Sequence, residues 1–212
     1  MTIEMGMQTF NVHWHPKLEI SQMGKHGIEN RETRKIVMGT HTGTHVDAPR
    51  HFINKGLTIE NVSLDILSGP ANVVDFSKLS DFHEIQLSEL EKEISDITIK
   101  RLICRFDWDA KALMTNKYYT DHPFFSEETC EWIVDNGFVL IGLDTPQPDD
   151  PKNGYGSVKD APNHRILLGG DVLIVEYLVN LRKISKKVVD LVVAPLKIKD
   201  GDGAPARCFV IE

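Results

Sequence analysis

One short segment of the chain gathers side chains of the kind that hold metal ions. Between His41 and His51, three histidines and one aspartate occur as His41, His45, Asp47 and His51. Imidazole and carboxylate groups are the ligands that borderline divalent cations such as zinc and manganese accept. A lone histidine is usually a surface residue or a satisfied core residue, but four such groups in alternating register around Gly43 are a different case. We therefore predict a metal site in this segment.

The conformation of this segment decides whether its side chains can share one ion. Gly43, several β-branched residues and a later proline all disfavour a helix. In an extended chain His41, His45 and Asp47 share one face, but the two histidines would then lie roughly 13 Å apart at about 3.3 Å per residue. We therefore expect a bend or bulge at Gly43, where the missing Cβ leaves room for the metal. The proline then turns His51 back toward the site.

A second pair of candidate ligands lies far along the chain. Glu176 interrupts the apolar run Val172–Val179, where a carboxylate is costly unless it is paired or bound to a cation. The alternatives are an ion pair with an arginine, or an edge strand from which Glu176 reaches water. Because His164 lies twelve residues upstream and the first cluster lacks a full set of ligands, we predict that both residues complete the metal site.

The elements that would position these groups are mostly strands. Two helices are predicted, one starting at Ser88 with a capping box to Glu91, and one capped by Ser126 and ended by Gly137. Strands are predicted for six segments that are rich in β-branched or aromatic residues, namely Lys35–Met38, Ala71–Phe76, Arg101–Phe106, Phe138–Asp144, Val172–Tyr177 and Val188–Ala194. The class is α/β or α+β, with strands dominating.

Two long stretches, 107–125 and 145–162, show little regular periodicity. Each could cover a site, and a solvated surface loop is an equal alternative. We predict that Trp14, Trp108 and Tyr119 contact an aromatic or cyclic substrate, with ordinary loop packing as the alternative. Three further histidines without sequence partners are candidates for pocket lining only: His13, His15 and His122.

The composition excludes several classes of function. The 212 residues include 24 Lys and Arg against 31 Asp and Glu, a formal charge of −7, whereas nucleic-acid binding needs clustered basic residues. The longest apolar run is far shorter than the ~20 residues that span a bilayer, so no membrane partner is expected. With no apolar leader after Met1 and no CxxC pair among three cysteines, we expect a cytoplasmic protein without disulfides. Length favours one domain over residues 1–212.

The metal-site segment resembles the motif of the cyclase-like metal-dependent hydrolase family, which includes bacterial kynurenine formamidase and isatin hydrolase. The family motif HxGTHxDxPxH matches His41–His51 at every fixed position. The family's downstream His…Glu pair is similar to His164 and Glu176, and the ending 194–207 is similar too. Family members generally begin with a strand carrying D-L-[ST]. The sequence starts just after that point, which is expected either for a truncated start or for a branch of the family without that strand and its subunit contact.

The resemblance implies a role for each candidate residue. The ligands of one or two zinc or manganese ions would be His41, His45, Asp47, His164 and Glu176. Asp47 could bridge two ions, and His51 would be the proton shuttle rather than a ligand. The fold would be an α/β, swivelling β/β/α domain with a mixed β-sheet core and a few flanking helices. The protein would form a homodimer or homotetramer.

Such a site predicts metal-assisted hydrolysis of an amide, lactam or ester carbonyl in a small cyclic or aromatic substrate. A bound divalent ion lowers the pKa of its water to ~7, and His51, with an ordinary pKa of ~6.5, can pass that proton to the leaving group. One alternative is a cyclase or dehydratase that polarises a carbonyl without consuming water. A less favoured alternative is a metal-binding protein without catalytic activity.

Overall fold

The computed structural model describes residues 1–212, and its centre is a closed barrel of seven strands in the order β10-β11-β3-β9-β8-β6-β4. Their bounds are β3 (His45–Asp47), β4 (Ser68–Asp75), β6 (Arg101–Arg105), β8 (Leu140–Leu143), β9 (Leu173–Glu176), β10 (Val188–Pro195) and β11 (Gly203–Ile211). The neighbours β4, β6, β8 and β9 pair in parallel, and the other pairs are antiparallel. The prediction of an α/β fold with a mixed sheet is confirmed.

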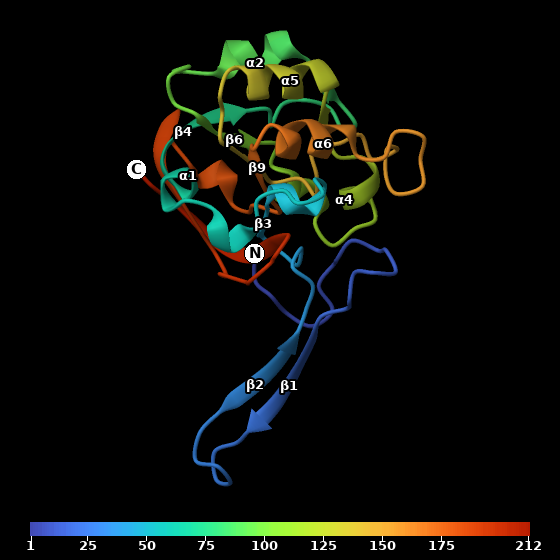
Figure 1. Cartoon of the computed structure of the whole chain (residues 1–212), viewed down its shortest axis with the longest axis vertical. Helices are drawn as coiled ribbons and strands as arrows, with labels where there is room; N and C mark the ends of the chain where they lie inside the picture. The colour runs from blue at the N-terminus through green and yellow to red at the C-terminus, as the bar shows by residue number, and fades with distance from the viewer.

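The helices are short and lie outside the barrel. They are α1 (Leu64–Leu67), α2 (Leu87–Glu93), α3 (Trp108–Ala112), α4 (Lys117–Thr120), α5 (Glu127–Asp135) and α6 (Pro162–Gly169). Helix α5 packs against both α2 and α6, and Figure 1 shows these three helices grouped over one side of the barrel. A small parallel pair, β5 (Glu84–Ile85) and β7 (Phe124–Phe125), and three 3₁₀ turns complete the body. None of the helices combines the length and the apolar character that crossing a membrane requires.

The two predicted helices form, with one change at the start of the first. Ser126 accepts a hydrogen bond in the first turn of α5, and Gly137 has the positive φ of +69° that ends the helix. The prediction that Ser88 opens a capping box is wrong. The cap is Gln86, two residues earlier, and α2 begins at Leu87, because the Glu89 carboxylate accepts the backbone N–H of Gln86 at 2.9 Å and fixes the first turn there.

The hydrophobic core has two parts, separated by the wall of the barrel. On β6 the side chain of Ile103 points into the barrel, while Leu102 and Cys104 point outward to the helices. This alternation is the expected consequence of the strand period of two. Cys104 and Cys130 are fully buried among apolar side chains, and burial raises the pKa of both thiols. Both therefore act as small hydrophobic residues, as predicted.

One element stands apart from the barrel. Strands β1 (Glu19–Gly24) and β2 (Thr33–Val37) form an antiparallel hairpin that projects away from the body of the molecule (Figure 1). Most of its side chains are exposed, including the apolar residues Met23, Ile28 and Ile36. Strand β2 confirms the prediction for Lys35–Met38, and three residues connect it to His41.

Candidate metal centre

The candidate ligands meet on the outer face of the barrel, beneath α6. His45 and Asp47 lie on β3, and the Cα of Glu176 on β9 lies directly opposite that of His45. Because Val46 between them points into the barrel core, His45 and Asp47 share the outward face. Helix α6 covers this face and contributes His164. The structure therefore brings together ligands that are more than a hundred residues apart in the sequence.

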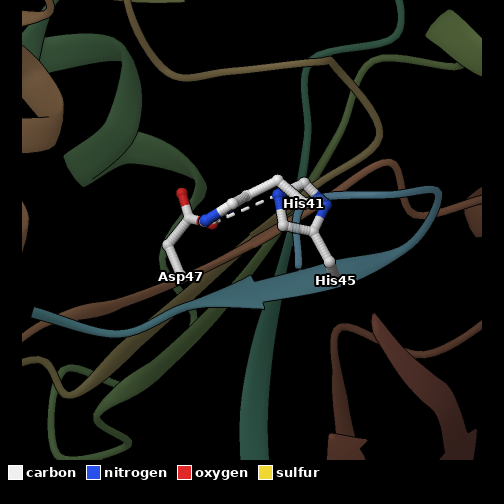
Figure 2. Close-up of side chains that lie close together, drawn as sticks. All are labelled: His41, His45 and Asp47. Carbon is white, nitrogen blue, oxygen red and sulfur yellow. Dashed lines mark hydrogen bonds and ion pairs between the residues drawn. The ribbon is translucent and has the colours of Figure 1, made fainter. Parts of the chain in front are cut away.

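The bend predicted before β3 is present. Gly43 adopts a φ of +64°, and the turn brings Nδ1 of His41 to 2.7 Å from Oδ1 of Asp47. Figure 2 shows the side chains of this segment turned toward one another. The expectation that the missing Cβ of Gly43 leaves room for the metal is wrong, because a Cβ there would face Met7 and not the cluster. The glycine that makes room at the cluster is Gly203, and the room is for the His41 ring, since a Cβ on Gly203 would lie 2.9 Å from that ring.

The cluster contains two sets of ligand atoms that share one carboxylate. In one set Nε2 of His45 lies 3.1 Å from Oδ1 of Asp47, and His41 approaches the same oxygen. In the other, Nε2 of His164 lies 3.4 Å from Oδ2 of Asp47 and 3.2 Å from Oε1 of Glu176. Within each set the ligand atoms lie within 4.8 Å of one another. Asp47 is thus placed to serve either one ion or a pair.

Two of the histidines have one ring nitrogen turned to the cluster and the other held by an acceptor outside it. Nδ1 of His45 lies 2.8 Å from the carbonyl oxygen of Gly43, which can only accept, so this nitrogen carries the proton. Nδ1 of His164 donates to the buried carboxylate of Asp149, which also accepts the backbone N–H of Asn163 at 2.6 Å in the first turn of α6. Fixing the outer nitrogen leaves Nε2 of both rings available to a cation.

His41 follows the same pattern with the nitrogens exchanged. Its Nε2 lies 2.8 Å from Oδ2 of Asp202, while Nδ1 faces Asp47. Burial by itself lowers the pKa of His41, but the carboxylates of Asp47 and Asp202 outweigh it and raise the pKa to about 10. In the absence of a cation, a proton on His41 therefore balances part of the buried negative charge.

The surroundings of the two buried carboxylates fit a divalent cation. Oδ2 of Asp47 and Oε1 of Glu176 are buried and accept no hydrogen bond. Burial and the nearby charge of Asp47 raise the pKa of Glu176. No arginine pairs with Glu176, and its strand β9 is an inner strand between β3 and β8, so this carboxylate is neither in an arginine ion pair nor on an edge strand. A cation between the two carboxylates would satisfy both unpaired oxygens.

His51 lies beside the cluster, on the 3₁₀ turn Pro49–His51 that follows β3. Its ring stacks on His41 with 3.9 Å between centroids, and its Nδ1 lies 3.2 Å from Oδ2 of Asp202. Burial lowers the pKa of His51. Its other nitrogen has no protein partner, so this ring can exchange a proton with a molecule in the adjoining cavity.

A cavity of about 450 Å³ opens over the cluster, and the predicted substrate contacts are placed differently around it. Trp14 lines the cavity, 53% exposed, with its ring edge-on to Tyr155 at 4.4 Å. Trp108 does not line it, because α3 turns this side chain fully into the core. Tyr119 does not line it either, and its hydroxyl group bonds to that of Tyr177 at 3.2 Å.

The segments predicted to be irregular differ from each other in the structure. Residues 107–125 contain α3, α4 and β7, so the prediction of a long unstructured loop there is wrong. Three of its aromatic residues, Trp108, Tyr118 and Phe125, pack into the core. Residues 145–162 form an irregular segment that reaches the cavity through Gln147 and Tyr155.

Sequence reasoning missed two residues of the site, Asp149 and Asp202. Asp149 lies in a proline-rich stretch and Asp202 between two glycines, and neither pattern by itself assigns a role to the acidic residue. The available signal was an acidic residue in a segment expected to cover or adjoin the site. Nothing local indicated which histidine each would contact, because Asp202 lies 161 residues from His41.

The mixed barrel thus carries a buried His, Asp and Glu cluster under a cavity, which is the arrangement of a metal-dependent enzyme site. The model of the putative cyclase family matches residues 1–150, and the chain belongs to this family. The chain is 29% identical over 176 residues to a kynurenine formamidase of Bacillus thuringiensis (strain Al Hakam), covering 83% of this chain and 78% of the relative. A kynurenine formamidase of Bacillus anthracis is 28% identical over the same coverage.

Solved structures give the same result. An isatin hydrolase bound to the product analogue thioisatinate is 27% identical with a TM-score of 0.82, covering 92% of this chain and 81% of that chain. Isatin hydrolase A from Labrenzia aggregata shares the fold, with a TM-score of 0.88 at 22% identity over 99% of this chain and 90% of that chain. The predicted resemblance to an arylformamidase-like hydrolase is confirmed.

Proposed function

We propose that the protein hydrolyses a small aromatic or cyclic amide, with an arylformamide or a lactam as substrate. The observation that carries the proposal is the shared Asp47 carboxylate, unpaired on one oxygen, at the floor of a cavity large enough for such a molecule. The similarity to kynurenine formamidases and to an isatin hydrolase supports the same bond type.

The residues that would hold the metal are the five ligands of the cluster. A divalent ion there, zinc or manganese, would polarise a carbonyl group and lower the pKa of water to ~7. We propose two ions per subunit at full loading, because the cluster divides into two sets around Asp47. His41 and His45 would hold one ion, and His164 and Glu176 the other.

His51 is the proposed proton-transfer residue. His51 forms a third group of possible ligands with His41 and Asp202, but it lies outside both sets that share Asp47. Its position in the wall of the cavity supports proton transfer as its role. With Nδ1 held by Asp202, its Nε2 is the nitrogen that takes a proton from water and returns it to the leaving nitrogen.

The aromatic lining of the cavity supports a planar substrate. Phe10, Trp14, Phe52 and Tyr155 contribute to its walls, and aromatic side chains favour stacked or edge-on contacts with another ring. Trp14 is the one predicted substrate contact that we retain. Trp108 and Tyr119 are assigned no direct contact.

The test is a turnover screen of purified protein with Zn²⁺ or Mn²⁺ against formanilide, isatin, simple lactams and cyclic esters. Hydrolysis of an arylformamide or lactam that stops on chelation and returns with the ion is the expected result. Turnover unchanged by chelation, or confined to substrates without a C–N bond, would contradict the proposal.

A metal-dependent cyclase or dehydratase is the second candidate, because the family carries the cyclase description. The two reactions differ in whether water enters the product. In H₂¹⁸O, hydrolysis places the label in the carboxylate product, whereas cyclisation or dehydration leaves the product unlabelled.

We also propose that the protein is a homodimer or homotetramer and that the β1–β2 hairpin takes part in the contact. Its exposed apolar side chains and its projection from the body support this assignment. Light scattering after size-exclusion chromatography should give a multiple of 24.0 kDa, and deletion of the hairpin should reduce the mass to that of one chain.

A further inference from the structure

The cavity has a polar group outside the metal cluster whose orientation is fixed by a buried histidine. Gln147 follows β8 and lines the cavity, only 8% exposed. Its backbone carbonyl accepts a hydrogen bond from the Thr145 hydroxyl at 3.1 Å, which holds this part of the segment in place. The side chain lies next to His122, 3.4 Å between the two Nε2 atoms.

The protonation of His122 determines which way the Gln147 amide points. Nδ1 of His122 lies 3.0 Å from the carbonyl oxygen of Pro123, so this nitrogen carries the proton. Burial lowers the pKa of His122 to about 4, so the ring is neutral near pH 7. Its Nε2 is therefore an acceptor, and it requires the NH₂ group of Gln147 as donor.

The carbonyl oxygen of Gln147 is left without a protein partner. It accepts none of the hydrogen bonds of the structure, it is not among the fully enclosed unpaired atoms, and it belongs to a side chain that lines the cavity. If Nε2 of His122 carried a proton, it would donate to the Gln147 carbonyl oxygen and the amide would be turned by 180°. Here the fixed tautomer of His122 gives the cavity an acceptor at this position.

We propose that Gln147 is a specificity-determining residue, whose side-chain carbonyl accepts a hydrogen bond from the N–H beside the scissile carbonyl of a secondary amide or lactam. This inference rests on the proposed function and narrows its substrate class. Esters and tertiary amides carry no such hydrogen, so when bound they would cover this oxygen without giving it a hydrogen bond. A site built to bond a substrate N–H discriminates strongly against an analogue without one.

The experiment compares formanilide, which has the N–H, with phenyl formate, which has an oxygen in its place. For each substrate, kcat/KM of Gln147→Leu is divided by kcat/KM of the unaltered metal-loaded protein, so the intrinsic reactivities cancel. We expect a loss of about 10- to 100-fold for formanilide and less than about 3-fold for phenyl formate. Glu91→Leu, a comparable polar-to-leucine change on the exposed face of α2, is the control and should leave both ratios at one.

A second variant tests the orienting role of His122. His122→Phe leaves Gln147 in place but frees its amide to turn. The preference for formanilide over phenyl formate should therefore fall, but by less than it falls in Gln147→Leu. Equal losses for both substrates in Gln147→Leu, or an unchanged preference in both variants, would overturn the inference.

Failure of the proposed function gives a different result. If the unaltered protein hydrolyses neither substrate with any metal, the arylformamidase proposal is wrong. Calorimetric binding of acetanilide, which has the same N–H, then decides the inference without turnover. Weaker binding to Gln147→Leu supports the hydrogen bond, and equal binding overturns it.

Discussion

The imidazole rings of His41 and His51 stack at 3.9 Å, and one carboxylate oxygen of Asp202 lies 2.8 Å from the first ring and 3.2 Å from the second. A candidate metal ligand and the candidate proton-transfer residue therefore share an acceptor. A substitution of Asp202 should therefore affect both metal binding through His41 and proton transfer through His51. This relationship leads to the first two predictions.

Removing a ligand and removing His51 should have different effects. His41→Ala and Asp47→Ala should lose bound metal, whereas His51→Ala should retain most of it and lose about 10²- to 10⁴-fold in turnover. Elemental analysis and steady-state kinetics on the same preparations measure the two effects. His83→Ala, a surface histidine paired with Glu89, is the control. Loss of metal from His51→Ala would make His51 a ligand.

Asp202→Asn should weaken both metal binding and turnover. The amide keeps the shape of the side chain but is a poorer acceptor for the His41 ring, and such outer partners are worth about 10- to 100-fold in metal affinity or activity. Titration with a competing chelator gives the affinity. Asp200→Asn, two residues away on the exposed turn, should change neither quantity. An unaltered affinity in Asp202→Asn would mean that this carboxylate does not hold His41 for the metal.

Asp149→Asn should affect the other half of the cluster. Asp149 fixes the Nδ1 proton of His164, so we expect one of two ions to bind about 10- to 100-fold more weakly while the other is little changed. The absorption spectrum of the Co²⁺-loaded protein, followed as Co²⁺ is added, distinguishes the two positions. Asp150→Asn is the neighbouring control. Equal weakening of both ions would indicate general loss of structure through the cap of α6.

His122 should make the protein less stable in mild acid. Its folded-state pKa is lowered to about 4 from an ordinary value of 6.5 by burial, so the unfolded chain binds the proton more readily. The stability that this group contributes is present above pH 6.5 and is lost as the pH falls to 4, by up to about 3 kcal/mol. Urea unfolding of the metal-free protein from pH 7 to pH 4 should show a smaller decline for His122→Phe. An identical decline in both proteins would contradict the assignment.

The local part of the site was predictable because its information lies within one segment. Alternation around Gly43 indicated that His41, His45 and Asp47 share a face, and that the chain must bend for them to meet. Both features are present. Glu176 was predictable for another reason, since a carboxylate in a run of buried residues needs a compensating charge wherever the strand lies.

The partners supplied by other parts of the chain were not predictable in the same way. Which carboxylate reaches which imidazole depends on the strand order β11-β3-β9 and on the placement of α6, and no local pattern encodes either. Trp108 shows the same limit. Its segment lacks periodicity in sequence, yet it forms a short helix that buries the indole in the core, where the Nε1–H donates to the backbone carbonyl of Tyr118 at 3.0 Å.

The hairpin of β1 and β2 has a consequence for how the site keeps its shape. An isolated two-stranded hairpin is marginally stable in water, so in a free chain this element should open and close independently and exchange its amide hydrogens fastest. Only three residues separate the end of β2 from His41. Each opening therefore frees the chain only as far as Thr40, whose hydroxyl donates to Asp202 at 2.9 Å. A molecule that binds the hairpin would hold the residues before Thr40 as well, and so would lower the entropy lost when the site orders around its ion.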